Sequence, residues 1–453
     1  MNKPIRMLIS IATPIATPIA TLLAALLFMP AAALAQAGAV LQWHAHAQNL
    51  VAAFSGRGNA AQAYTMALIQ IAVHDAALAV RGGEAPGRRP HAPFIADLPA
   101  APGASLNAAV ASAAFRVGFE RVNANPAARN AYRTAYEAYM AAIPEGRAKA
   151  DGVALGEAVA QAVLAARAND NFFNTAAFTN PAPEPGVWQA VSAVTPYATA
   201  GAADYAMAFT TPLTASTPGA RRIRPPLRLN SGKMRRDFEE TQALGALTSP
   251  RRTPAMTDVV QFWTESGFTL WTRNVRDIVA ARGLDEFEAA RALAAFSVAT
   301  GDAMLACFEA KYAHLAWRPW QAIQRADQDG NPRTQPDPGW TPAVRANHPE
   351  YPAGHGCYAG AATQVLELLF GDFAVTLTST GAQVAGWPVV ASARFDSLDE
   401  VNDDNANARV WGGLHWRTTM ERSSRWSAKI ARSAVCGAFG LRCAKPRFEQ
   451  DDD

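Results

Sequence analysis

The feature that most restricts the fold of this chain is a succession of long, alanine-rich segments in which apolar residues recur at helical spacing. Loops rich in proline and glycine separate these segments. The alternation of apolar and polar residues that is typical of strands is scarce. The candidate helices cover residues 61–80, 105–122, 127–142, 150–168, 233–246, 255–281, 285–317, 357–371 and 398–432. The sequence therefore predicts an all-α protein built as a helical bundle.

One long stretch interrupts the helical pattern. Residues 171–231 are dense in proline, threonine and glycine, so we expect an irregular segment that packs over the bundle or forms a lid. No internal repeat is evident. We expect one compact unit, with an amino-terminal helical layer over residues 36–230 and a second helical part over residues 231–453.

The amino terminus has the features of a leader. Lys3 and Arg6 precede an apolar stretch, and the small residues Ala33 and Ala35 form a cleavage site. Residues 1–35 are therefore predicted to be a secretory signal peptide that is removed near Ala35. An uncleaved membrane anchor is the alternative. Cleavage would place the mature protein in the periplasm or outside the cell.

Charge and hydropathy restrict the class of partner. The formal net charge of +3 is too small to indicate nucleic-acid binding, and the arginine pairs lie among prolines, as in solvated loops. After the leader, we expect no segment that is both long enough and apolar enough to span a bilayer without charges. Small-molecule substrates are therefore the expected partners, with no nucleic acid and no integral membrane segment. The oligomeric state stays open.

Three short pieces in the carboxyl-terminal half gather basic residues and histidines. In the first, Lys311 and Arg318 lie seven positions apart and are followed by Pro319. On a helix that ends at this proline, the two cations would project from nearly the same face. The second piece, residues 352–355, reads Pro-Ala-Gly-His and precedes an apolar run. Gly354 would allow an anion to approach the unpaired N–H groups of a helix start.

The third piece places Arg409 six residues before His415, with Gly412 and Gly413 between them. A guanidinium and an imidazole could therefore point into one pocket. Together the three pieces supply what a tetrahedral oxyanion requires: cations around its oxygens, a backbone N–H, a proton donor, and a nucleophile or ligand at the central atom.

In this order and spacing, the pieces resemble the vanadium-dependent haloperoxidases and the related type 2 phosphatidic-acid phosphatase superfamily. The family pattern is a lysine, six residues and Arg-Pro, then Pro-Ser-Gly-His, then an arginine, five residues and a histidine. The stretch DFEETQALG from Asp237 and the region around Trp263 and Trp271 also look like soluble bacterial members. The resemblance thus covers most of the mature chain. It implies paired four-helix-type bundles with the anion site in the carboxyl-terminal half.

The resemblance also implies a role for each matching residue. His415 would be the axial ligand of vanadate, or the nucleophile that forms a phosphohistidine in a phosphatase. His355 would act as general acid and base. The groups that neutralise or hydrogen-bond the anion oxygens would be Lys311, Arg318, Arg409 and the N–H of Gly354. Vanadate is therefore the implied cofactor, and phosphate can occupy the same site.

Ala353 departs from the family pattern, because a serine there would donate a hydroxyl hydrogen bond to an oxyanion oxygen. Such bonds to charged groups contribute about 1.5 to 3 kcal/mol, so we expect weaker anion binding. His348 resembles the bromoperoxidase-type pocket, although it could equally serve the turn that contains it. His314, one helical turn after Lys311, is a candidate for the layer of residues behind the pocket.

Each of these residues also has an ordinary structural interpretation. The three cations could be solvated or salt-bridged charges, and Glu309 lies close enough in sequence to compete for Lys311. His355 and His415 could be structural histidines with satisfied hydrogen bonds. The combined order and spacing of the three pieces favour the functional interpretation.

Three functions are compatible with such a site. The favoured one is a haloperoxidase-like oxidoreductase that binds vanadate, activates hydrogen peroxide and oxidises a halide. The second is a soluble periplasmic acid phosphatase that hydrolyses phosphate esters through a phosphohistidine. The third is a non-catalytic oxyanion-binding member whose site has drifted, with Ala353 as the first sign.

Export would permit disulfides among the four cysteines. Cys436 and Cys443 are the best candidate pair, because they would close a short loop. Cys307 and Cys357 could approach each other behind the site, but we prefer to interpret them as small buried residues without a link.

Overall fold

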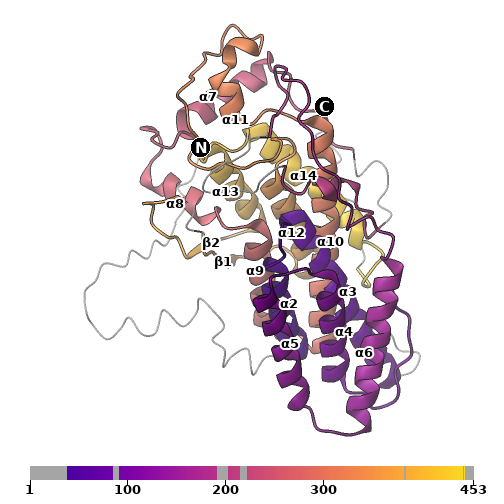
Figure 1. Ribbon diagram of the computed structural model, residues 1–453. Coiled ribbons are helices and arrows are strands. Elements are labelled where there is room, and N and C mark those ends of the chain that lie inside the picture. Colours follow the sequence, from indigo (N-terminus) through magenta and orange to yellow (C-terminus); the bar gives the residue numbers. More distant parts are fainter. Residues whose placement is uncertain are drawn as a thin grey trace, which may run out of the picture.

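The computed structural model describes residues 38–84, 91–190, 202–214, 222–381, 384–441 and 443. Within them the protein is built from two groups of helices that share one long helix (Figure 1). The predicted all-α, helical-bundle fold is confirmed. The proposed signal peptide falls on residues 1–35, outside the described residues.

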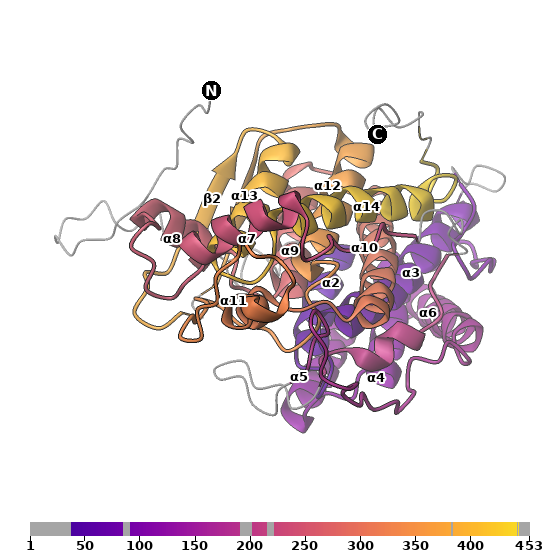
Figure 2. The ribbon, with the colours of Figure 1, turned by 90° about the horizontal axis from the view of Figure 1, so that it is seen from above.

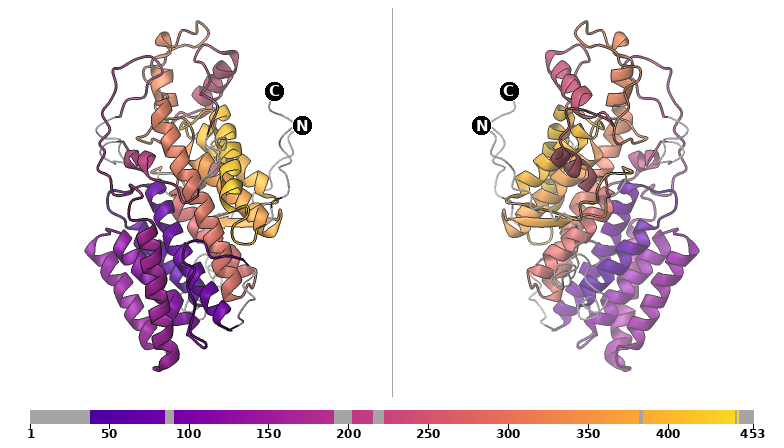
Figure 3. Two further views of the ribbon diagram at one scale, coloured as in Figure 1. Left: turned by 90° about the vertical axis from the view of Figure 1, so that its right-hand side faces the viewer. Right: turned by 90° about the vertical axis from the view of Figure 1, so that its left-hand side faces the viewer.

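The amino-terminal group forms a bundle at one end of the molecule, drawn in indigo to magenta (Figures 1 and 3). Its helices are α2 (Ala39–Ala52), α3 (Asn59–Glu84), α4 (Leu106–Arg121), α5 (Pro126–Ala141) and α6 (Arg147–Ala166). Small side chains bring α4 and α6 into close contact, because a Cβ added at Gly156 would lie 2.4 Å from the carbonyl oxygen of Ala109.

The carboxyl-terminal group lies at the other end (Figures 1 and 2). Its α-helices are α7 (Gly232–Leu244), α8 (Pro254–Phe262), α9 (Gly267–Ala281), α10 (Glu286–His314), α11 (Pro319–Gln324), α12 (Gly354–Phe370), α13 (Leu398–Trp411) and α14 (Arg417–Val435). Two short 3-10 helices, η2 (Tyr205–Phe209) and η3 (Ala326–Gln328), lie in the connections. One antiparallel ribbon pairs β1 (Val375–Thr378) with β2 (Ser392–Phe395).

Helix α10 joins the two groups. It packs against α3 on the amino-terminal side and against α12 and α14 on the carboxyl-terminal side (Figures 2 and 3). A capping box fixes its start, because Asp285 accepts from the Glu288 N–H while the Glu288 side chain accepts from the Asp285 N–H. Its 29 residues carry the chain about 43 Å, from the outer end of the bundle to the candidate site.

Sequence and structure differ most at the ends of helices. The predicted helix 285–317 ends at His314, because Leu315 adopts a left-handed conformation with φ of 49°. Pro319 then begins α11 instead of ending α10, and Arg318 is the residue before it. The prediction that Lys311 and Arg318 share one helical face is therefore wrong.

Two other predicted helices are each divided in the structure. The range 255–281 contains α8 and α9, and the range 398–432 contains α13 and α14. The second break follows Gly413, whose φ of 76° is unfavourable for other residues. Helices α2 and α11 were not predicted; α11 has only six residues.

The described parts of 171–231 contain one short 3-10 helix and otherwise no regular structure, as predicted. They pack against both groups of helices, since Asp204 accepts the N–H groups of Gly58 and Ala60 at the start of α3. The carboxylate of Asp302 accepts the N–H groups of Leu213 and Thr214, and Trp188 donates its N–H to the Leu315 carbonyl at 2.7 Å. Of the two predicted arrangements, the described residues show the packed one.

By length and composition alone, two helices would be able to cross a membrane. Asn59–Gly83 is 100% buried over its most apolar window and Glu286–His314 is 94% buried. Core helices of a folded protein have the same composition, and both of these lie inside the protein.

Candidate oxyanion-binding site

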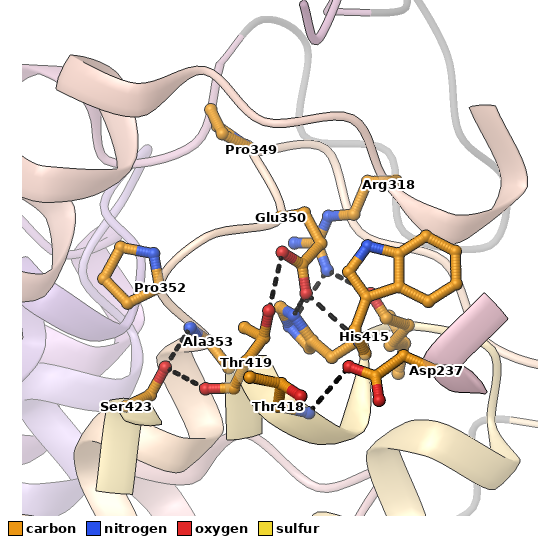
Figure 4. Close-up of polar contacts among 12 residues, drawn as sticks. Asp237, Arg318, Pro349, Glu350, Pro352, Ala353, His415, Thr418, Thr419 and Ser423 are labelled. Atoms are coloured by element: carbon orange, nitrogen blue, oxygen red, sulfur yellow. Dashed lines mark hydrogen bonds and ion pairs between the residues drawn. The ribbon is translucent and has the colours of Figure 1, made fainter. Parts of the chain in front are cut away.

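The three pieces singled out in the sequence meet in the carboxyl-terminal group of helices. The first comes from the end of α10 and the link to α11, the second from the start of α12, and the third from the end of α13 and the turn into α14 (Figure 4). Their convergence is visible in the environment of His415. After burial, the positive charges of Arg318, Lys311 and Arg409, in this order, lower the pKa of its imidazole well below the usual value.

The ring of His415 is held at both nitrogens. Nδ1 lies 3.0 Å from Oε1 of Glu350, and Nε2 lies 3.0 Å from Nη1 of Arg318. Oε1 of Glu350 also accepts the N–H of Trp416, so it serves as an acceptor here and Nδ1 carries the proton. The lone pair of Nε2 then accepts from Nη1 of Arg318. With a lowered pKa the imidazole is neutral, so Nε2 can act as a ligand or as a nucleophile.

Glu350 is the important residue that sequence reasoning missed. Its carboxylate also accepts from the N–H of Trp416 at 3.2 Å and from Oγ1 of Thr419 at 3.1 Å (Figure 4). Burial raises the pKa of this carboxyl to about 7, against the opposing effects of Arg318 and the Trp416 N–H. A carboxylate five residues before His355 was the only sequence signal, and nothing indicated that it would face His415.

Arg318 joins two of the histidines. Besides His415, its Nη1 donates to the carbonyl of Leu414 at 2.9 Å, and its Nε donates to the carbonyl of His348 at 2.7 Å. Nη2 lies 2.8 Å from Nδ1 of His348. Burial lowers the pKa of this guanidinium to about 10, so it remains charged at neutral pH.

Lys311 is completely buried. Its ammonium donates to the carbonyls of Pro349 at 2.9 Å and Glu350 at 3.3 Å, and also to that of Pro352. The lysine therefore adds positive charge to the site and shapes the loop that leads to Gly354. Burial and the neighbouring Arg318 lower its pKa well below the usual value, whereas Glu350 raises it.

Gly354 is the first residue of α12, where helical N–H groups have no intrahelical acceptor. A Cβ added to Gly354 would lie 3.9 Å from Cε of Lys311, so the amide and this cation are close. The amide of Ala353 is already used, because it donates to Oγ of Ser423 at 2.8 Å (Figure 4). The start of α12 therefore lies beside the Lys311 side chain.

His355 and Arg409 form the other side of the site. After burial, Arg409 makes the largest contribution to lowering the pKa of His355 well below the usual value. Nε2 of His355 lies 3.4 Å from the carbonyl of Glu265, to which it donates, so Nδ1 is left to accept a proton. Arg409 donates to the carbonyl of Trp263 at 2.9 Å, and this bond fixes its guanidinium.

The methyl group of Ala353 packs in a small apolar cluster with Ala406 and Met420. Ala353 is fully buried, so the departure from the family pattern exchanges a potential donor for an apolar contact. Ser423 lies beside it but does not restore the donor, because its hydroxyl donates to the carbonyl of Thr419 at 2.6 Å.

Of the remaining predicted residues, His348 lies against Arg318, and its ring centroid is 5.6 Å from that of Phe308. Burial and the charge of Arg318 lower its pKa well below the usual value. His314 does not contact His415 or Arg318 among the described residues. It packs against Tyr351 and lines a cavity behind Glu350.

A disulfide ties the first two pieces together. Cys307, one turn before Lys311, is bonded to Cys357, which follows His355 by two residues. The preferred interpretation of two unlinked buried residues is therefore wrong, and the alternative of close approach behind the site is correct. The predicted pair Cys436–Cys443 is confirmed.

The donor set suits an oxyanion. Three buried cations, a neutral imidazole and helix-start N–H groups surround one region. Among the described residues there is no group of three or more His, Cys, Asp or Glu that could hold a metal cation directly. A tetrahedral oxyanion that accepts one imidazole at its central atom fits these residues, and vanadate and phosphate are both of this kind.

Comparison with known proteins agrees with this geometry. Residues 291–439 match the VCPO second helical-bundle domain. Vanadium chloroperoxidase from Curvularia inaequalis is 25% identical, over 38% of this chain and 37% of its own length, so the match spans little more than a third of that relative.

Two solved structures show the same fold over more of the chain. A bacterial vanadium-dependent iodoperoxidase superimposes with a TM-score of 0.68 at 18% identity, covering 88% of this chain and 94% of that one. A holo-type bacterial vanadium-dependent chloroperoxidase gives a TM-score of 0.64 at 17% identity, covering 83% and 92%.

Proposed function

We propose that this protein has the activity of a vanadium-dependent haloperoxidase. Its motifs resemble those of this superfamily, its fold resembles that of the solved bacterial enzymes, and residues 291–439 match the VCPO second helical-bundle domain. The substrates would be hydrogen peroxide and a halide. The observation that carries the proposal is the buried His415, whose Nε2 accepts from Arg318 and whose pKa is lowered by burial and by the charges of Arg318, Lys311 and Arg409. The names of the relatives support the same activity.

His415 would hold vanadate through Nε2, and Arg318, Lys311, Arg409 and the Gly354 N–H would surround its oxygens. When bound, vanadate would act as a Lewis acid that withdraws electron density from peroxide without changing its own oxidation state. Glu350 would keep His415 in the required tautomer.

His355 is placed to move protons. Its imidazole is neutral and its Nδ1 is free to accept, so it would take a proton from incoming hydrogen peroxide and return it to a leaving oxygen. Arg409 would place a positive charge beside this proton transfer.

A signal peptide cleaved near Ala35 would bring the enzyme to the periplasm or the medium, which is part of the same proposal.

The soluble acid phosphatase remains the second candidate, because the same neutral Nε2 of His415 could attack a phosphate ester and form a phosphohistidine. His355 would then protonate the leaving alcohol. A drifted, non-catalytic site is the third candidate, motivated by Ala353.

One experiment separates the three. The protein from residue 36 is loaded with orthovanadate, and the oxidation of bromide and iodide by hydrogen peroxide is measured beside phosphate-ester hydrolysis by the vanadate-free protein. We expect halide oxidation that depends on vanadate. Ester hydrolysis that vanadate inhibits would replace the proposal with a phosphatase, and neither activity would indicate the drifted site.

A further inference from the structure

A second recess adjoins the candidate site without belonging to it. A cavity of about 300 Å³ is lined by Glu350 and Thr419, the two side chains that lie behind His415. The residues assigned to the oxyanion do not line it: His415, Arg318, Lys311, His355 and Arg409 are all absent from its wall. The cavity is therefore a separate space on the Nδ1 side of His415.

The wall of this cavity is mainly aromatic and apolar. Trp317 and Trp416 contribute indole rings, and Met234, Leu227 and Leu229 complete the apolar surface. An apolar cavity of about 150 Å³ is large enough to bind benzene. Twice that volume accommodates a fused pair of aromatic rings, which would pack on the indoles.

One exposed cation, Arg228, belongs to the cavity wall. Among the described residues its guanidinium has no hydrogen-bond or ion-pair partner. Arg222 and Arg224 lie in the same segment and are also exposed. An exposed guanidinium without a partner is suited to bind a carboxylate through two parallel hydrogen bonds.

The end of the cavity at Glu350 cannot take an anion. Glu350 is there, and both of its oxygens already accept from His415, Trp416 and Thr419. A carboxylate that entered this end would be repelled by Glu350 and would find no donor. A ligand with one negative group would therefore place it on Arg228 and away from Glu350.

From this arrangement we propose that the cavity binds a small aromatic carboxylate. The ring system lies between Trp317 and Trp416, and the carboxylate lies on Arg228. His314, which is half-buried in the same wall, supplies an imidazole N–H to the second carboxylate oxygen. The site is distinct from the oxyanion site and does not require that the protein be a haloperoxidase.

The test uses 2-naphthoate and isothermal titration calorimetry on the vanadate-free protein from residue 36. We expect one site per chain with sub-millimolar affinity. Arg228→Gln should weaken binding about tenfold, the size of one lost charge-assisted interaction. The matched control is Arg147→Gln on α6, whose exposed guanidinium lies in the other bundle, and it should bind as the wild type does (Figure 1).

Two further titrations locate the ligand. The neutral analogue 2-naphthalenemethanol should bind wild type and Arg228→Gln equally, because it has no charge for the arginine to recognise. Inorganic phosphate at saturation of the oxyanion site should leave 2-naphthoate binding unchanged. Absence of binding at millimolar 2-naphthoate, equal affinity in Arg228→Gln, or displacement by phosphate would each overturn the proposal.

Discussion

Nδ1 of His415 lies 3.0 Å from Oε1 of Glu350, and the exposed fractions of the two side chains are only 2% and 1%. This buried pair sets the chemistry of the site, because it fixes which nitrogen of His415 carries the proton. The other nitrogen then accepts from Arg318, and the charges of Lys311 and Arg409 also lower the pKa of the ring. The predictions below test this arrangement and the residues around it.

His415→Ala should abolish vanadate-dependent halide oxidation, because it removes the imidazole nitrogen proposed to hold vanadate, which lies 3.0 Å from Nη1 of Arg318. Ester hydrolysis, if the protein has it, should be lost as well. Circular dichroism would show whether the fold is kept. A folded variant that keeps its activity would contradict the assignment of His415 as ligand or nucleophile.

Glu350→Ala should weaken orthovanadate binding by about 10- to 100-fold, the usual effect of losing the partner that orients a ligating histidine. Glu350→Gln should do less, because its amide oxygen can still accept from Nδ1. Calorimetric titration with vanadate measures both. Asp237→Asn is the matched control, since this buried carboxylate accepts the nearby Thr418 N–H at 3.0 Å without touching His415 (Figure 4). If the control weakened vanadate binding equally, a specific role of Glu350 would be rejected.

His355→Ala should lower kcat by about 10²- to 10⁴-fold while the affinity for vanadate changes much less. The reason is that its neutral imidazole transfers protons and contributes no charge to anion binding. Steady-state kinetics and vanadate titration on one preparation give the two numbers. Equal losses in both would contradict a role in proton transfer.

Ala353→Ser should tighten binding of vanadate or phosphate by about 10- to 100-fold, which corresponds to about 1.5 to 3 kcal/mol for a hydroxyl donor to a charged group. Ala406→Ser places the same hydroxyl in the same apolar cluster on another helix and serves as the control. Should both variants bind alike, the hydroxyl at position 353 would not reach the anion.

The two disulfides should differ in their effect on the free energy of unfolding. In the chain-entropy description, Cys307–Cys357, with a separation of 50 residues, contributes about 4 kcal/mol, and Cys436–Cys443, with a separation of 7, contributes about 2 kcal/mol. Guanidinium denaturation of the two double alanine variants measures the difference. A larger loss from the short loop would show that packing of the carboxyl-terminal segment outweighs chain entropy.

The long helices could be predicted because apolar periodicity and alanine content identify buried helices such as α3 and α10. Their ends could not. Leu315 ends α10 in a left-handed conformation that the sequence does not predict. Pro319 can either end or begin a helix, and here it begins α11.

The candidate site was predictable to the extent that its residues lie in short, ordered pieces. Lys311, His355 and His415 were identified from spacing, and the structure brings them together. Glu350 was not, since 65 residues separate it from His415 and only folding brings the two into contact. Lys311 and Arg318 lie in the same site, as predicted, but the predicted reason is wrong. They do not share one helical face, because α10 ends at His314 and a turn connects the two residues.

The pairing of Cys307 with Cys357 has a chemical consequence for the proposed use of hydrogen peroxide. All four cysteines are in disulfides, so no thiolate stands beside His355 or elsewhere in the chain. Thiolates are the side chains that peroxide converts most readily to sulfenic and then to irreversibly oxidised acids. With these sulfurs bonded to each other beside His355, the site would contain no thiol for hydrogen peroxide to oxidise if the protein has the proposed activity.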